Sequence, residues 1–354
     1  MKKIFFVTSK IHGGGSENVL KIISKKFSIF QHKIYILVLD DNKNNKSKEK
    51  DIKYFFFKKK KKYQIKSISQ NLDKTLFIRY KIKSIKPDIV FSFITETNIL
   101  TLLANAFLGY RIVVSERNDP KLERKKKIWK LLRFLTYGIA DKITVNSKEA
   151  VIYLKKFYFS KKVVYLPNPI KNIKRKKNYK KKIITFIGKF EYQKGIDVLI
   201  KAFLLSDIFK SGWKLQLIGD GSLIKQMQLE CKKVDHLNSI IFKPYTSNLD
   251  LIYSESSFLI LPSRYEGTPN VILEAASIKL PFVVSDRCFE ICKLFRSSYV
   301  FKNEDENDLS RILKKIITLN KTSIDKITED NFYILNKNFN EKIVLSSWKN
   351  ILLN

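Results

Sequence analysis

Residues 263–275 read Ser263-Arg264-Tyr265-Glu266-Gly267-Thr268-Pro269-Asn270-Val271-Ile272-Leu273-Glu274-Ala275 and contain two glutamates eight positions apart. Threonine is a common helix cap and proline a common first helical residue, so we predict that Thr268 caps a helix that begins at Pro269. The backbone N–H groups near Gly267, Thr268 and Asn270 would then emerge at the positive end of the helix dipole. Such an end attracts a diphosphate.

Glu266 precedes the predicted helix and Glu274 lies about six residues inside it, which separates them by roughly 9 Å along the helix axis. One carboxylate would accept hydrogen bonds from sugar hydroxyls on one side of a diphosphate, and the other from ribose hydroxyls on the far side. A well-capped surface helix with two solvated glutamates has the same spacing. The spacing alone leaves both interpretations open.

A chain of 354 residues is too long for one typical domain and fits two of about 170 residues each. The three cysteines, Cys231, Cys288 and Cys292, form no paired framework, which indicates a reducing compartment and no structural disulfide. No apolar run approaches the length of about 18 residues that a membrane-spanning helix needs. We therefore expect a cytoplasmic protein.

The net charge of +36 is concentrated in the first half of the chain. Residues 1–182 hold 46 Lys and Arg against 13 Asp and Glu, whereas residues 183–354 hold 23 against 20. Enrichment in Lys, Ile, Asn and Phe is expected from an AT-rich coding sequence, but that drift would affect both halves alike. The asymmetry favours an anionic partner for the first domain, either phospholipid headgroups or a polyphosphate ligand, with nucleic acid as a further alternative.

Short β-branched and aromatic runs alternate with helical periodicity throughout, which predicts an α/β fold of two doubly wound domains facing a cleft. We predict a first domain over residues 1–170, a basic linker over 171–182, a second domain over 183–335 and a closing helix over 336–354 that packs across the domain junction. The expected strands are Ile4–Thr8, Ile34–Leu39, Asp88–Phe93, Arg111–Ser115, Lys142–Asn146, Val163–Leu166, Ile183–Ile187, Lys214–Ile218, Ile240–Phe242, Phe258–Leu261, Pro281–Val284 and Tyr299–Phe301. The lysine run at 58–62 is interpreted as a solvated loop.

Two glycine-containing loops each follow the first strand of a domain. The loop at 13–17, Gly-Gly-Gly-Ser-Glu, lets the backbone approach a phosphate or sugar closely, although such turns are common in this fold class. The loop at 188–195 carries Lys189 and Lys194, which can neutralise a departing diphosphate, each contributing about 1.5 to 3 kcal/mol. In so lysine-rich a chain, both can equally be ordinary surface charges.

Ser115-Glu116-Arg117-Asn118-Asp119-Pro120 ends a strand of the first domain. Glu116, Arg117 and Asn118 are candidates to face a substrate there, and a simple turn is the alternative.

In this order and context, the segments resemble the family-4 glycosyltransferases of the GT-B fold from Gly14 to about Pro281. Gly14-Gly15-Ser16-Glu17 resembles the first-domain loop of that family, Gly188 to Gly195 its phosphate-binding loop, and Glu266 to Glu274 its Glu-x7-Glu element. The segments at 92–98, 115–116 and 166–169 look like the subset that extends lipid-linked oligosaccharides with N-acetylhexosamines in bacterial surface-glycan assembly.

The resemblance implies transfer of a sugar from a nucleotide donor with retention of anomeric configuration and without a metal or other cofactor. It implies that Glu266, Lys194 and Lys189 are catalytic, with Glu266 on the hexose hydroxyls and Glu274 on the ribose. The implied donor-binding residues are Gly15, Gly188, Gly267, Thr268, Pro269, Asn270, Leu273 and Glu274. Position 189 is Lys where the family commonly has Arg, position 279 is Lys where a Gly is frequent, and the loop at 115–119 lacks the His of many relatives.

Lys121 to Leu135 predicts a basic helix with Trp129 as an aromatic anchor, of the kind that lies on an anionic bilayer or grips a lipid diphosphate. The alternative is a helix whose leucines pack on their own sheet while its lysines face headgroups.

We therefore expect a transferase, peripheral on the cytoplasmic face of the membrane, that moves a hexose or N-acetylhexosamine from a UDP-sugar to a lipid-linked or surface glycan, with no nucleic acid as partner. The alternatives are a basic nucleic-acid-binding protein and a sugar-nucleotide epimerase of the same fold.

Overall fold

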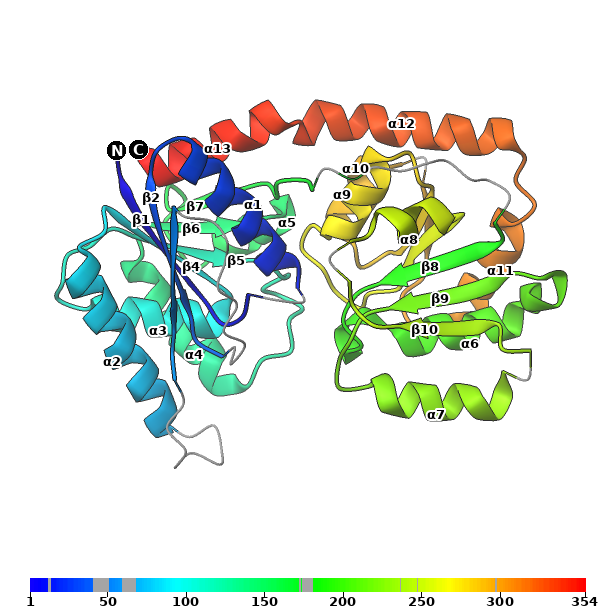
Figure 1. Ribbon diagram of the computed structural model, residues 1–354, viewed down its shortest axis with the longest axis horizontal. Coiled ribbons are helices and arrows are strands. Elements are labelled where there is room, and N and C mark those ends of the chain that lie inside the picture. Colours follow the sequence, from blue (N-terminus) through cyan, green and yellow to red (C-terminus); the bar gives the residue numbers. More distant parts are fainter. Residues whose placement is uncertain are drawn as a thin grey trace. The chain divides into compact units, whose positions relative to one another are not determined.

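The structure, a computed structural model, describes residues 1–11, 14–40, 51–58, 68–171, 173, 181–235, 237–246, 248–296 and 298–354. The chain forms two compact units (Figure 1). The first comprises Met1–Pro169 and Glu341–Asn354, and the second comprises Ile170–Asn340. Most of the predicted linker at 171–182, residues 59–62 of the lysine run and Gly13 of the first glycine loop lie outside the described residues.

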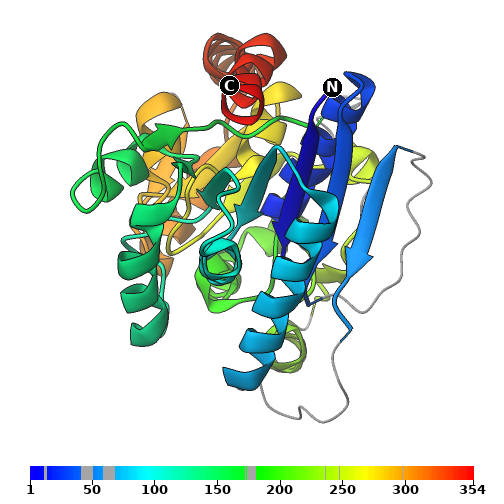
Figure 2. The ribbon, with the colours of Figure 1, turned by 90° about the vertical axis from the view of Figure 1, so that its left-hand side faces the viewer.

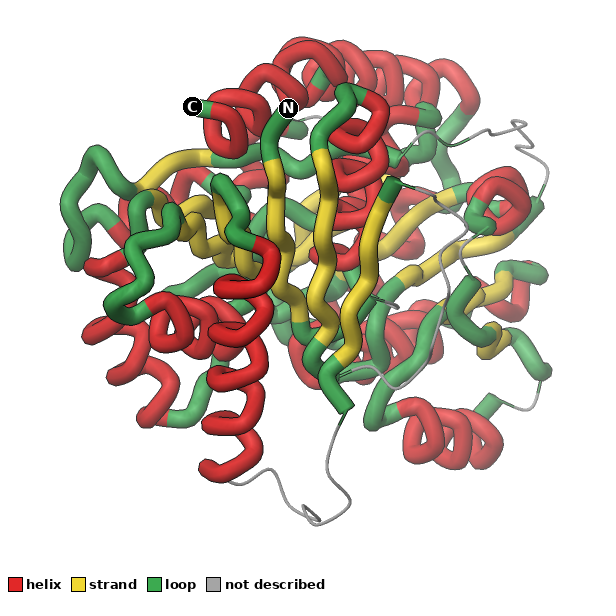
Figure 3. Tube along the Cα trace, turned by 60° about the vertical axis from the view of Figure 1, so that its left-hand side comes forward, coloured by secondary structure: helices red, strands yellow, loops and turns green. Residues whose placement is uncertain are grey.

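Within its described residues, the first unit contains a seven-stranded parallel sheet in the order β3-β2-β1-β4-β5-β6-β7. Strands are drawn in yellow in Figure 3. The strands are β1 (Lys3–Thr8), β2 (Lys33–Val38), β3 (Ile52–Phe56), β4 (Ile89–Phe93), β5 (Ile112–Glu116), β6 (Lys142–Val145) and β7 (Val163–Tyr165). The helices are α1 (Gly15–Ile29), α2 (Ile68–Ile85), α3 (Thr95–Asn105), α4 (Lys127–Thr136), α5 (Lys148–Leu154) and α13 (Glu341–Leu353).

Both faces of the first sheet are covered by helices. On one face, α2, α3 and α5 supply buried side chains to a hydrophobic cluster against which α4 also packs. On the other face, α1 and α13 contribute to a separate cluster (Figures 1 and 2). Strands covered on both faces need apolar residues on both, and β4 and β5 are accordingly buried along their whole length.

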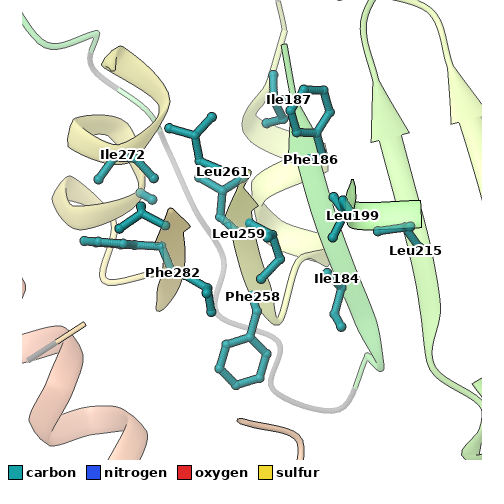
Figure 4. Packing of buried hydrophobic residues seen from close by; sticks show 14 of the residues in the cluster. Ile184, Phe186, Ile187, Leu199, Leu215, Phe258, Leu259, Leu261, Ile272 and Phe282 are labelled. Atoms are coloured by element: carbon teal, nitrogen blue, oxygen red, sulfur yellow. The ribbon is translucent and has the colours of Figure 1, made fainter. Parts of the chain in front are cut away.

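The second unit contains, in its described part, a six-stranded parallel sheet in the order β10-β9-β8-β11-β12-β13. The strands are β8 (Ile183–Ile187), β9 (Lys214–Ile218), β10 (Ile240–Lys243), β11 (Phe258–Leu261), β12 (Phe282–Ser285) and β13 (Tyr299–Phe301). The helices are α6 (Ile196–Ser206), α7 (Ile224–Val234), α8 (Asp250–Glu255), α9 (Asn270–Ser277), α10 (Phe289–Leu294), α11 (Glu306–Ile316) and α12 (Lys321–Phe339). Figure 4 shows side chains of β8 and β11 packing with those of neighbouring elements in the core.

All twelve predicted strands are present, with each end within one residue of its prediction. Strand β3 was not predicted, because its Ile-Lys-Tyr-Phe-Phe run lies next to a run of lysines. The predicted α/β class with two doubly wound units is confirmed.

The predicted closing helix at 336–354 is two helices. Asn340 takes an extended backbone (φ −61°, ψ 154°) that ends α12, and α13 begins at Glu341. Trp348 anchors α13 to the first unit: it is fully buried, and its indole N–H donates to the Pro167 carbonyl at 2.9 Å. The Lys2 ammonium donates to the Leu353 carbonyl, so the two ends of the chain lie side by side.

Replacing Trp348 should detach α13. We expect Trp348→Ala to lower the free energy of unfolding of the first unit by about 3 to 5 kcal/mol, because the side chain leaves a large cavity. Trp348→Phe retains the ring packing on Phe91 and loses the hydrogen bond, so it should cost less. Urea unfolding followed by circular dichroism measures both, and equal stability of the Ala variant and the native protein would contradict the anchoring role.

Candidate functional site

In the second unit, two loops that leave parallel strands at the same edge of the sheet are joined by hydrogen bonds. One, at 188–195, follows β8, and the other, at 262–269, follows β11. The backbone N–H of Arg264 donates to the Gln193 carbonyl at 2.8 Å, and the Gln193 side-chain amide donates to the Tyr265 carbonyl at 3.0 Å. Ligands of open α/β sheets bind at this edge.

Arg264 holds the two loops together with its side chain. Its guanidinium makes a bidentate ion pair with Asp197 on α6, at 3.0 and 2.7 Å, and contacts Glu304 at 2.6 Å. The same group lies 4.0 Å from the centre of the Tyr192 ring. A planar guanidinium is suited to such a combination of bidentate and stacking contacts, which a lysine would not reproduce.

Lys194 and Glu266 meet where these loops converge. The Lys194 ammonium contacts Glu266 Oε1, and the Ser263 hydroxyl donates to the same oxygen at 2.7 Å. The Glu266 side chain is almost fully buried, and Lys194 remains about one-fifth exposed. The structure therefore brings together two of the three residues predicted to be catalytic. The third, Lys189, is half-buried in the same loop.

Gly195 permits this close approach. It has a left-handed backbone (φ +61°), and a Cβ atom built on it would lie 2.1 Å from the Pro262 carbonyl oxygen. Any side chain at position 195 would push the loop of Lys194 away from the loop of Glu266.

The helix after Glu266 begins one residue later than predicted. Pro269 is the N-cap of α9, its backbone is extended (φ −73°, ψ 123°), and Asn270 is the first helical residue. The N-cap position belongs to Pro269, which makes no side-chain cap hydrogen bond, so the prediction of Thr268 as N-cap was wrong. Gly267, Thr268 and Pro269 are buried, whereas Asn270 is half-buried at the positive end of the helix.

Glu274 lies inside α9 and is buried, as is the neighbouring Leu273. The Tyr253 hydroxyl, from α8, donates to Glu274 Oε2 at 2.7 Å. Burial raises the pKa of Glu274 from 4.5 to about 6, and the Tyr253 hydroxyl and the Lys171 charge act in the opposite direction. The helix thus carries a buried ionisable acceptor that receives a hydrogen bond from a neutral hydroxyl.

The remaining predicted donor residues lie at strand-to-helix turns of both units. Gly15 is the exposed first residue of α1 in the first unit, and Gly14 precedes it as N-cap. A Cβ atom on Gly14 would lie 2.1 Å from a carboxylate oxygen of Glu17, which folds back over the helix start. Gly188 follows β8 and is half-buried.

The three acceptor-side candidates of the first unit differ in exposure. Arg117 is buried, and its guanidinium carbon lies 5.6 Å from the centre of the Phe93 ring and 5.1 Å from that of Trp348. It donates to Asn168 Oδ1 at 2.8 Å and to the Leu166 carbonyl at 3.2 Å. Burial lowers its pKa to about 9. Arg117 therefore connects the end of β5 with the segment just after β7 and lies beside Trp348 of α13. Asn118 is half-buried, and its side-chain amide donates to Glu123.

Glu116 is buried in a polar cluster at the end of β5. Its carboxylate accepts from the Thr95 hydroxyl, 3.0 Å from each oxygen, and from the Tyr137 hydroxyl. The same Thr95 hydroxyl lies 3.3 Å from Glu123 Oε2. Burial and the nearby Glu123 carboxylate raise the pKa of Glu116 to about 7, against the smaller opposing effects of Arg133 and Tyr137.

Two family models match the chain in tandem. The model described as Glycosyltransferase Family 4 matches residues 13–172, and the one described as Glycosyl transferases group 1 matches residues 169–330. The chain belongs to the family 4 glycosyltransferases. The second match contains both loops of the Lys194–Glu266 site, and the first contains the Glu116 cluster.

Several named proteins are similar to this chain in sequence or in fold. This glycosyltransferase is 25% identical to an α-1,4-N-acetyl-D-galactosaminyltransferase of Campylobacter jejuni, over 84% of this chain and 80% of the relative. Its fold is that of sucrose-phosphate synthase from Thermosynechococcus elongatus, with a TM-score of 0.86 at 11% identity over 99% of this chain and 98% of the other. Anabaena HepE, solved in complex with UDP-glucose, has a TM-score of 0.84 at 13% identity over 99% of both chains.

The described residues of the glycosyltransferase include no helix long and apolar enough to cross a membrane. Nor do they bring three or more His, Cys, Asp or Glu side chains together as a metal site would require. The three cysteines are free thiols.

Sequence reasoning missed the residues that support the site. Ser263 contacts Glu266 within one loop, and this contact depends on the conformation of that loop. Arg264 reaches Asp197 only where two loops meet. Tyr253 is 21 positions from Glu274, and no local pattern links them. For Arg264 the missing information was the pairing of β8 with β11, and for Tyr253 it was the packing of α8 beside α9.

Glu116 should make stability depend on pH. Burial raises the pKa of Glu116 from 4.5 to about 7, so the folded state binds the proton more tightly than the unfolded state does. Protonation of Glu116 therefore stabilises the folded state, and this stabilisation is lost as pH rises through this window. We therefore expect Glu116→Gln to gain stability relative to the native protein as pH rises from 4.5 to about 7. Chemical unfolding at several pH values measures this, with the exposed Glu341→Gln as control. Parallel curves for Glu116→Gln and the native protein would contradict the prediction.

Proposed function

We propose that this glycosyltransferase moves a hexose or an N-acetylhexosamine from a UDP-linked donor to a lipid-linked glycan, with retention of anomeric configuration and without a metal ion. The observation that carries the proposal is the Lys194–Glu266 pair, held by Ser263 at the start of α9. A buried carboxylate and a partly exposed ammonium stand together where a helix presents its positive end. This arrangement suits a ligand that has both hydroxyl groups and a diphosphate.

Glu266 and Lys194 bind different parts of the donor. Glu266 accepts hydrogen bonds from hexose hydroxyls, while Lys194, whose ammonium has three donors, can contact Glu266 and a phosphate together. Charge develops on the departing diphosphate in the transition state, and Lys194 and Lys189 stabilise it there without rearrangement. Glu274 binds the ribose hydroxyls from inside α9. These lysines supply positive charge that a metal ion provides in other transferases.

The comparisons support the chemical class of donor and acceptor. The Campylobacter jejuni relative is named for transfer of N-acetylgalactosamine to a GalNAc-GalNAc-diNAcBac-PP-undecaprenol acceptor, and HepE was solved with UDP-glucose. An acceptor on a lipid diphosphate places the reaction at a membrane surface. We therefore propose that the enzyme works as a peripheral protein on the cytoplasmic face, and that Asn118 and the neighbouring polar cluster of the first unit serve the acceptor.

Product analysis tests the proposal. Purified enzyme with UDP-N-acetylhexosamines or UDP-hexoses and undecaprenyl-diphosphate glycans should yield a glycan one sugar longer, with the donor's anomeric configuration by NMR and undiminished yield in EDTA. Glu266→Ala and Lys194→Ala should each reduce turnover by roughly 10² to 10³, as loss of an oxyanion donor does. Lys225→Ala on α7 is the matched control for loss of a lysine.

Three outcomes would contradict the proposal. Near-normal turnover of folded Glu266→Ala and Lys194→Ala would exclude this pair as the catalytic site. A product with the opposite anomeric configuration to the donor would exclude the retaining mechanism. Release of an altered sugar nucleotide without any acceptor would instead identify an epimerase.

Glu274 should act on donor binding more than on turnover. Loss of a hydrogen bond to a charged group costs about 1.5 to 3 kcal/mol, so we expect Glu274→Gln to raise the donor KM roughly 10-fold or more with a smaller change in kcat. In the native enzyme the donor KM should also rise as pH falls through about 6, because protonation removes a carboxylate acceptor. This rise should be absent from Glu274→Gln. A KM that depends equally on pH in both proteins would contradict the assignment.

A further inference from the structure

The surface helix α4 has an unusual distribution of polarity. Its inward side includes Arg133, only 7% exposed, whose guanidinium donates to the Pro120 carbonyl at 3.0 Å. Its outward side carries Ile128, Leu131, Phe134 and Leu135, each more than half exposed. A helix that only covers its own sheet has the opposite arrangement. The alternative interpretation of the sequence was that the leucines pack inward, but of the apolar side chains of α4 only Trp129 and Leu132 pack on the core, and both are half-buried.

A second segment extends the apolar surface of α4. Phe157, just after α5, lies edge to face with Phe134 at a centroid distance of 6.5 Å. The Tyr158 hydroxyl donates to the Arg133 carbonyl at 3.0 Å and fixes this segment beside the helix. Phe159 follows and is 80% exposed. We call the exposed side chains of Ile128, Leu131, Phe134, Leu135, Phe157 and Phe159 the α4 face.

Positive charge surrounds the α4 face. Residues 121–162 contain 13 lysines and arginines and three acidic residues. Lys126, Lys127 and Lys130 are exposed, and none of them forms an ion pair with any described residue. Lys155 and Lys156 are exposed on the second segment, next to Phe157. Exposed apolar side chains accompanied by exposed lysines on the same two segments have the composition of an interfacial membrane-binding element.

We infer that the α4 face docks on an anionic lipid bilayer, with its aromatic and aliphatic side chains in the headgroup boundary and its lysines on lipid phosphates. A second copy of the chain fits less well, because a symmetric contact would bring two cationic rims together. The inference deepens the proposed function by naming the surface that meets the membrane carrying the acceptor. It concerns binding to lipid and requires no turnover.

Vesicle sedimentation tests the docking surface with the full-length protein. The native protein should bind vesicles of one part phosphatidylglycerol to two parts phosphatidylcholine, bind pure phosphatidylcholine far less, and be released by salt. Leu131→Ser/Phe134→Ser/Phe159→Ser should reduce binding at least 10-fold, since each buried apolar group contributes. Lys126→Gln/Lys127→Gln/Lys130→Gln should weaken binding to the anionic vesicles by roughly fivefold per lysine and leave residual binding to neutral vesicles unchanged.

A matched control uses α7 of the second unit. Leu229→Ser/Lys232→Gln/Lys233→Gln likewise removes an exposed leucine and two exposed lysines, and should leave binding unchanged. Thermal unfolding by circular dichroism verifies that each variant is folded. All replaced residues are exposed, so a substantial loss of stability is not expected.

Two results would overturn the inference. One is equal vesicle binding by the native protein and both α4-face variants. The other is no vesicle binding together with dimers, detected by light scattering, that dissociate in the apolar variant, which would identify a second copy as the occupant. Turnover on a short water-soluble acceptor separates this inference from the proposed function: the variants should retain it, while Glu266→Ala should lose it whether or not lipid binds.

Discussion

The Lys194–Glu266 site depends on how closely the loop after β8 approaches the loop after β11. The left-handed backbone of Gly195 and its missing side chain allow the chain to pass against the Pro262 carbonyl. Arg264 then connects the loops by its ion pair with Asp197 and its hydrogen bond to the Tyr192 carbonyl. Lys194 and Glu266 are 72 positions apart, and their contact follows from this approach and from the adjacent parallel strands that carry the loops. The site is therefore a property of the sheet edge, where backbone geometry fixes the positions of charged groups before a ligand arrives.

Buried carboxylates in the two units are stabilised in different ways. Glu266 has an ammonium partner, so its charge is compensated inside the loop pair. Glu116 and Glu274 receive their hydrogen bonds from hydroxyl groups, and burial raises the pKa of both. Glu116 and Glu274 therefore gain or lose a proton closer to neutrality than an exposed glutamate does. Glu116 also has Glu123 nearby, so the first unit concentrates acidic groups within an otherwise strongly cationic half of the chain.

Much of the fold could be predicted from the sequence, because both sheets are parallel and buried on both faces. Such strands are short continuous apolar runs, as in Ile-Ile-Thr-Phe-Ile of β8, and they stand out from a lysine-rich background. The run of β3 is interrupted by Lys53 and was missed. The break at Asn340 also has no strong signal, since asparagine is tolerated within helices. For the site, the sequence indicated Glu266, Lys194 and Glu274. Arg264 and Tyr253 act through contacts with residues 67 and 21 positions away, and Ser263 acts through a hydrogen bond that the conformation of its own loop sets.

The α4 face shows where sequence periodicity reaches its limit. Apolar residues repeated at helical spacing reveal that a helix has an apolar stripe, but they do not reveal which stripe faces the core. Helix α4 has apolar side chains on two faces. Trp129 and Leu132 pack against the core, whereas Leu131 and Phe134 are exposed to solvent. The choice is set by Arg133, whose head group reaches the Pro120 carbonyl from the inward side. Turning the helix to bury Leu131 would break that contact and move the guanidinium, so a buried polar contact inside the protein holds an apolar surface in solvent.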